Sequence, residues 1–144
     1  MRVFVDANVI ISVLNKEYPL FTYSARVLSL CSHPRFMVYA SPLSLAIAFY
    51  FATKKSGEVR AKQKIARLLD YLKITSIDEG TVLCAAKNPA VHDFEDGMQF
   101  YAAHNHACEV IVTENKEDFY FGHIPALNCE EFLRRHVQGK LATL

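Results

Sequence analysis

The chain has 144 residues, of which 51% are hydrophobic and 22% charged, and its 16 basic and 15 acidic residues leave a formal net charge of +1. This length and composition fit one globular domain and exclude a disordered chain. The balance of charge also excludes a global basic field that would attract nucleic acid, so any such contact has to be local.

Short apolar strands alternate with helices along the chain. In chain order, the hydrophobic periodicity predicts a strand over residues 2–5, helices over 9–14 and 21–32, a strand over 35–40, helices over 43–52 and 58–72, a strand over 73–77, helices over 79–88 and 93–106, a strand over 109–113, a loop or single turn over 114–121, a strand over 125–127 and a helix over 129–138. No hairpin turn joins two of these strands. This alternation predicts an α/β fold in which helices cover both faces of a parallel sheet.

Two of the expected helices have informative faces. Ser41 and Pro42 are a helix-start signal, and because residues 43–52 are nearly all apolar we expect that helix to be buried. Its aromatic residues 49–51 are expected to pack in the core or at a dimer interface rather than to stack on bases. The helix over 58–72 has an apolar face and a basic face, and we expect the basic face to be solvated.

The four cysteines are far apart and form no CxxC pair. They are therefore expected to be small buried residues rather than zinc ligands or disulfide partners. No apolar run reaches the roughly 20 residues needed to span a bilayer, and the N-terminal residues lack the pattern of a secretory signal. We expect a cytoplasmic protein with no membrane contact.

Three acids stand where a parallel sheet would bring them together. Asp6 ends the first strand, Asp96 lies in the first turn of a long helix, and Asp118 follows the strand over 109–113. Functional sites in such sheets form outside the carboxyl ends of the strands. Clustered carboxylates repel one another unless a cation compensates them, and oxygen ligands open to water suit Mg²⁺ or Mn²⁺. We therefore expect a divalent-metal site at these three residues.

The segments VDANVI, DFEDGMQFYAA and VTENKEDF resemble the first, third and fourth signature motifs of the PIN-domain family. The resemblance extends over essentially the whole chain. It implies a three-layer α/β/α sandwich with a central parallel sheet of about four to five short strands, formed by one domain over residues 1–144. It also implies a metal-dependent nuclease, as members of that family are, and many bacterial members are the toxin halves of VapBC-type toxin–antitoxin pairs. An RNA substrate, an antitoxin partner and a homodimer are the corresponding expectations.

By the same resemblance, Asp6 is the first metal ligand, Asp96 the third family acid and Asp118 the fourth. The three acids would also be the catalytic residues. The supporting polar groups would be Asn8, Thr113 and Asn115. No organic cofactor is implied.

One departure from the family pattern concerns its second acid, usually a glutamate in the helix after the second strand. No acid occurs between Ser41 and Ala52, and the missing glutamate would fall at about Ile47. Asp93, one helical turn before Asp96, is a candidate for partial compensation.

Simpler roles are open for the same acids. Asp6 can cap the following helix, and Asp118 can form a turn. Asp93, Glu95 and Asp96 can complement the dipole of the helix that they begin. Two function classes therefore stand beside each other: a ribonuclease of the PIN type, and a catalytically silent module of the same fold that binds RNA or a protein partner. A structural homodimer is a third, weaker alternative.

Overall fold

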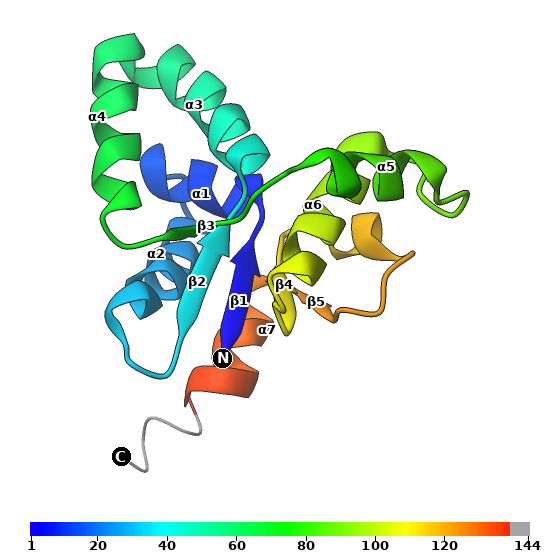
Figure 1. Ribbon diagram of the computed structural model, residues 1–144. Coiled ribbons are helices and arrows are strands. Elements are labelled where there is room, and N and C mark those ends of the chain that lie inside the picture. Colours follow the sequence, from blue (N-terminus) through cyan, green and yellow to red (C-terminus); the bar gives the residue numbers. More distant parts are fainter. Residues whose placement is uncertain (139–144) are drawn as a thin grey trace.

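The structure is a computed structural model that describes residues 1–138. Its centre is a sheet of five strands, all parallel, in the order β3-β2-β1-β4-β5 (Figure 1). The strands are β1 (Arg2–Val5), β2 (Met37–Ala40), β3 (Lys73–Ile74), β4 (Val110–Val112) and β5 (Ala126–Leu127). The predicted strand count and direction are confirmed.

Helices connect the strands at nearly all the predicted places. They are α1 (Ala7–Leu14), α2 (Phe21–Ser29), α3 (Pro42–Ser56), α4 (Glu58–Leu69), α5 (Glu79–Lys87), α6 (Phe94–Asn105) and α7 (Cys129–Leu133), with the 3₁₀ turns η1 (Leu30–Ser32) and η2 (Lys116–Phe119) and the π-helical turn η3 (Arg134–Gln138). The strand expected over 73–77 is shorter than predicted. Both of its residues are exposed at the edge of the sheet, where only one neighbour is available for pairing.

Alternate residues of the central strand enter two separate cores. Val3 and Val5 belong to a core that includes residues of α1, α2, α3, α4 and α7, whereas Phe4 belongs to a second core with Phe100 and Ala103 of α6. This alternation is the side-chain period of a strand buried on both faces. The α/β/α layering expected from the sequence is therefore confirmed.

The prediction that the apolar helix over 43–52 is buried is wrong for its outer face. In α3 the residues Ser44, Ala48 and Ala52 are buried, but Tyr50 is 55% and Phe51 43% exposed. The helix packs against α1 and α4 and continues beyond the sheet, so no other described layer covers its opposite side (Figure 1). There Lys54 Nζ lies 4.4 Å from the centroid of the Tyr50 ring.

The cysteines form no disulfide within the described residues, as expected. Burial raises the pKa of the Cys108 and Cys129 thiols to about 12, so both are protonated at neutral pH. Cys84 departs from the expectation because it is exposed. Over residues 1–138, no helix is long and apolar enough to cross a membrane.

The strand order places a topological switch beside β1. From β1 the chain adds β2 and then β3 on one side, and it crosses to the other side to add β4 and then β5. Ligand crevices in open parallel sheets form at such a point, outside the carboxyl ends of the strands. Here the switch point lies between the end of β1 and the end of β4.

Candidate metal centre

Asp6 leaves β1 at the switch point and caps α1. Its backbone N–H donates to Val112 O of β4 at 3.0 Å, and its Oδ1 accepts from the N–H of Ala7 at 2.8 Å. The predicted capping role is therefore real. Each carboxylate oxygen has two lone pairs, so a capping bond to Oδ1 leaves Asp6 able to bind a cation as well.

Thr113, directly after β4, is the hub of the polar groups around Asp6. It is fully buried, and its hydroxyl donates to Asp6 Oδ2 at 2.8 Å. Thr113 Oγ1 in turn accepts from Asn8 Nδ2 at 3.3 Å and from the N–H of Asn115 at 3.1 Å. Asn8 also accepts the N–H of Glu114 through its Oδ1 at 3.2 Å. The predicted supporting groups are thus joined in one network, in which Asn115 takes part through its backbone.

Asp93 and Asp96 lie at the start of α6. Asp93 is the N-cap residue, and its Oδ1 accepts from the N–H of Asp96 at 3.1 Å. The Asp96 side chain is half-buried, whereas Asp93 is exposed. Capping by Asp93 fixes the first helical turn and so the direction in which Asp96 leaves it.

Asp118 lies in η2, which follows β4 after a short loop. Its N–H donates to Asn115 O at 3.0 Å, so the turn-forming role considered for this segment is present, and its side chain is half-buried. Because the N–H of Asn115 also donates to Thr113 Oγ1, this turn is connected by hydrogen bonds to the Thr113 network beside Asp6.

The five acids Asp6, Asp93, Glu95, Asp96 and Asp118, called the acidic cluster below, act on one another electrostatically. Burial, and then the charges of Asp93, Asp118, Asp6 and Glu95, raise the pKa of Asp96 to about 7. Burial and the charge of Asp118 also raise the pKa of Asp6, against the lowering effect of the bonds from Thr113 and Ala7. For Asp118, burial, Glu117 and Asp93 raise the pKa. Carboxylates that follow β1, begin α6 and lie in η2 therefore share one region.

The donor set fits a hard divalent cation, although the side chains do not form a closed coordination shell. Carboxylates that raise one another's pKa are stabilised by a positive ion placed among them. In the part of the chain that the structure describes, no three His, Cys, Asp or Glu side chains lie close enough to hold an ion as they stand. The acids therefore influence one another's ionisation, but as they stand they do not form a metal-binding group of three.

No acid enters this region from α3. Ile47 is a half-buried apolar residue of that helix. Nearby, at the end of β2, the buried hydroxyls of Ser41 and Ser44 bond to the buried amide of Gln99 on α6. We did not predict this network. Gln99, a polar residue one turn after Asp96 in a helix with an apolar face, was the signal in the sequence that could have indicated it.

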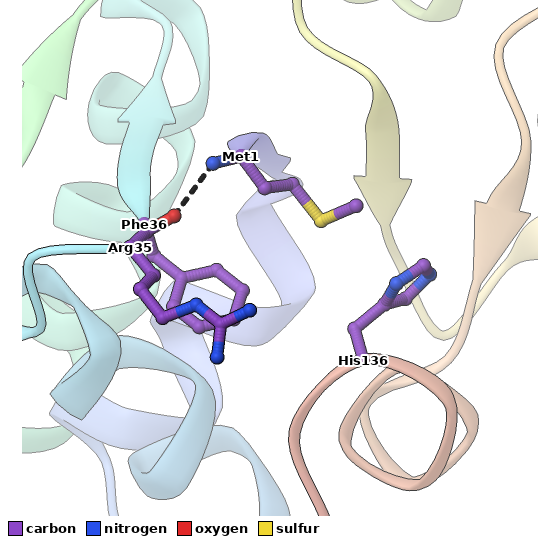
Figure 2. A pocket seen from close by; sticks show the side chains of 4 residues that line it. All are labelled: Met1, Arg35, Phe36 and His136. Atoms are coloured by element: carbon purple, nitrogen blue, oxygen red, sulfur yellow. Dashed lines mark hydrogen bonds between the residues drawn. The ribbon is translucent and has the colours of Figure 1, made fainter. Parts of the chain in front are cut away.

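A separate pocket lies at the opposite, amino-terminal end of the sheet. Met1, Arg35, Phe36 and His136 line it, and the Met1 nitrogen donates to Arg35 O at 2.6 Å (Figure 2). Its lining, as far as the described residues form it, contains no carboxylate. It therefore does not compete with the acidic cluster as a site for a hard cation.

Comparison with known proteins identifies relatives over most of the chain. A family model described as PIN domain matches residues 2–117. The chain is 26% identical over 138 residues to a protein named Ribonuclease VapC1 from Aquifex aeolicus (strain VF5), covering 93% of this chain and 94% of that protein.

Two solved structures have a similar fold. One is of VapBC2 from Rickettsia felis bound to a DNA fragment from their promoter, with a TM-score of 0.67 and 16% identity over 89% of this chain and 98% of that chain. The other is VapC20 of Mycobacterium tuberculosis, a toxin that cleaves the sarcin-ricin loop, with a TM-score of 0.61 and 15% identity over 76% of this chain and 86% of that chain.

Proposed function

Since the chain belongs to the PIN domain family, we propose that it is a metal-dependent endoribonuclease of the VapC type, the toxin of a toxin–antitoxin pair. The observation that carries the proposal is the acidic cluster: acids from three elements raise one another's pKa at the switch point of the sheet. Its substrate would be single-stranded or structured RNA, and its partners an antitoxin and a second copy of the chain. It would act in the cytoplasm as one domain over residues 1–144.

Asp6, Asp96 and Asp118 would hold Mg²⁺ or Mn²⁺ and would be the catalytic residues. A divalent ion at such a site supplies an activated water and positive charge beside the scissile phosphate. The protein's own contribution is orientation. Thr113 holds Asp6 Oδ2 at 2.8 Å, and Asn8 and Asn115 hold Thr113, so the Asp6 carboxylate is fixed before any ion arrives.

The raised pKa of Asp96, about 7, agrees with this role. A carboxylate that is half protonated near neutral pH without an ion gives up its proton when a cation binds. Ion binding should therefore release protons near pH 7. Asp93, which caps α6, would support the position of Asp96 rather than replace the missing acid of α3.

The test is cleavage of labelled RNA by the wild type and by Asp6→Asn, with Mn²⁺ and with EDTA. We expect cleavage that needs the metal and falls by at least about 100-fold in Asp6→Asn, because a ligand is lost. Asp70→Asn, at the C-terminal end of α4, is a matched control that should remain active. Equal activity of Asp6→Asn and wild type would overturn the proposal.

A second candidate is a catalytically silent module of the same fold that binds RNA or a protein. The observation that favours it is Ile47, an apolar residue where the family has its second acid. RNA binding that is independent of Mn²⁺ and occurs without cleavage would support this candidate. Robust Mn²⁺-dependent cleavage by the wild type would exclude it.

A further inference from the structure

A buried amide bridge joins α6 to the start of α3. Gln99 is 1% exposed, its Nε2 donates to Ser44 Oγ at 2.6 Å, and its Oε1 accepts the hydroxyl of Ser41. The two serines are fully buried and also bond to each other, since Ser44 N donates to Ser41 Oγ at 3.0 Å. The amide thus uses one donor and its acceptor inside the protein, on two hydroxyls that are themselves fixed by the N-cap of α3.

The bridge lies beside the acidic cluster. Ser41 directly follows β2, so the serines stand at the carboxyl end of the strand next to β1. Gln99 follows Asp96 by three residues, which places both side chains on neighbouring positions of one helix face. Among the described residues, every hydrogen bond between α3 and α6 involves Gln99.

The charges of the acidic cluster oppose the position of α6 that this bridge maintains. Asp93, Glu95 and Asp96 put three carboxylates at the start of α6, and like charges on Asp6 and Asp118 oppose the approach of that turn. The family's second acid would add a further negative charge from α3. In this chain α3 instead offers two neutral hydroxyls, which attract the amide of Gln99 without adding to the repulsion.

We propose that Gln99 is a positioning residue: by bonding to Ser41 and Ser44, it holds the first turn of α6 close enough to β1 for Asp96 and Asp6 to bind one divalent ion. The inference rests on the proposed function, because it concerns the same metal. Gln99 itself is too deeply buried to contact RNA. Its effect is on the geometry of the ligands.

The test compares Gln99→Met, which keeps the length of the side chain but removes the amide, with Tyr101→Phe. The control removes the 3.0 Å bond between Tyr101 and Asn88, which ties the same helix to the end of α5 instead of to α3. Isothermal titration with Mn²⁺ should give a Kd raised by about 10-fold or more in Gln99→Met, as for other residues that orient metal ligands, and unchanged in Tyr101→Phe. Cleavage by Gln99→Met should recover at saturating Mn²⁺ with an unchanged KM for RNA.

Ser44→Ala removes one acceptor of the bridge and is the milder second variant, in case Gln99→Met does not fold. It should raise the Kd in the same direction, and a merely structural role would lower the free energy of unfolding without moving the Kd of the folded protein. A wild-type Kd in Gln99→Met or Ser44→Ala, alongside metal-dependent cleavage by the wild type, would overturn this inference alone. A wild type that neither binds Mn²⁺ nor cleaves RNA would overturn both it and the proposed function.

Discussion

Replacing Asp96 by asparagine should stabilise the metal-free protein at neutral pH while abolishing metal binding. In the folded state, burial and four neighbouring acids raise the pKa of Asp96 from 3.8 to about 7. The folded protein therefore binds more protons than the unfolded chain between about pH 4 and pH 7. Because of this, the stability that the protonated Asp96 contributes is complete below pH 4 and is lost as the pH rises to about 7.

The magnitude follows from the size of that shift. At about 1.4 kcal/mol for each pH unit, a change from 3.8 to about 7 sets an upper bound of about 4 kcal/mol. The side chain is half-buried, and solvent screening reduces the expected effect to about 1–2 kcal/mol. Asp96→Asn should therefore be more stable than the wild type by about that amount at pH 8 and nearly equal to it at pH 4.5.

Urea unfolding in EDTA at pH 4.5, 6 and 8 measures this difference. Asp70→Asn is the control, since Asp70 is not among the groups that raise the pKa of Asp96. Adding Mn²⁺ at pH 8 should stabilise the wild type and leave Asp96→Asn unchanged, because only the former retains the ligand. If Asp96→Asn were less stable than the wild type at pH 8, or responded equally to Mn²⁺, the account of the acidic cluster would be refuted.

Three further substitutions test separate parts of the site. Thr113→Val removes the hydroxyl that donates to Asp6 Oδ2, and it should lower the free energy of unfolding by about 1–3 kcal/mol and raise the Kd for Mn²⁺ by about 10-fold. Thr22→Val, at an exposed position of α2, is its control, and an unchanged Mn²⁺ titration of Thr113→Val would contradict the role of Thr113. Gly97→Ala places a Cβ 2.7 Å from Val91 Cγ1 and 3.1 Å from Ala85 Cβ, so it should cost about 1–3 kcal/mol in urea unfolding, whereas Gly80→Ala, whose Cβ meets only Asp78 Oδ1 at 3.5 Å, should not. Equal free energies of unfolding for Gly97→Ala and Gly80→Ala would show that α5 can move away from α6 at little cost. Ile47→Glu restores an acid at the position of the missing one and should tighten Mn²⁺ binding by about 10-fold through the added charged ligand; weaker binding would show that α3 does not face the ion.

Much of the fold follows from local sequence signals. Several local signals mark element boundaries that the structure retains. They are the β-branched runs ending at Asp6 and Thr113, the cap at Ser41 with Pro42, and Gly57 between two helices. Gly57 adopts φ +83°, which glycine tolerates without strain, so α4 can start directly after α3 ends. Parallel pairing follows because every connection is long enough for a crossover.

Other features depended on tertiary geometry that no local pattern encodes. The apolar sequence of α3 suggested burial on all sides, but the exposure of Tyr50 and Phe51 depends on how far that helix extends past the sheet. Predicting the bridge through Gln99 would have required knowing that α6 lies beside the end of β2. Asp6, Asp96 and Asp118 were predicted from their places at strand ends and a helix start and from the order of the motifs, but their electrostatic coupling is visible only in the structure.

The central claim is that Asp6, Asp96 and Asp118 hold one divalent ion between them. A crystal soaked in Mn²⁺, with anomalous data collected near the manganese absorption edge, tests it most directly. We expect a single anomalous peak within about 2.0–2.4 Å of oxygens of all three carboxylates, and no peak in Asp6→Asn crystals soaked in the same way. A wild-type crystal with no peak among these acids, or an equal peak in Asp6→Asn, would contradict the account.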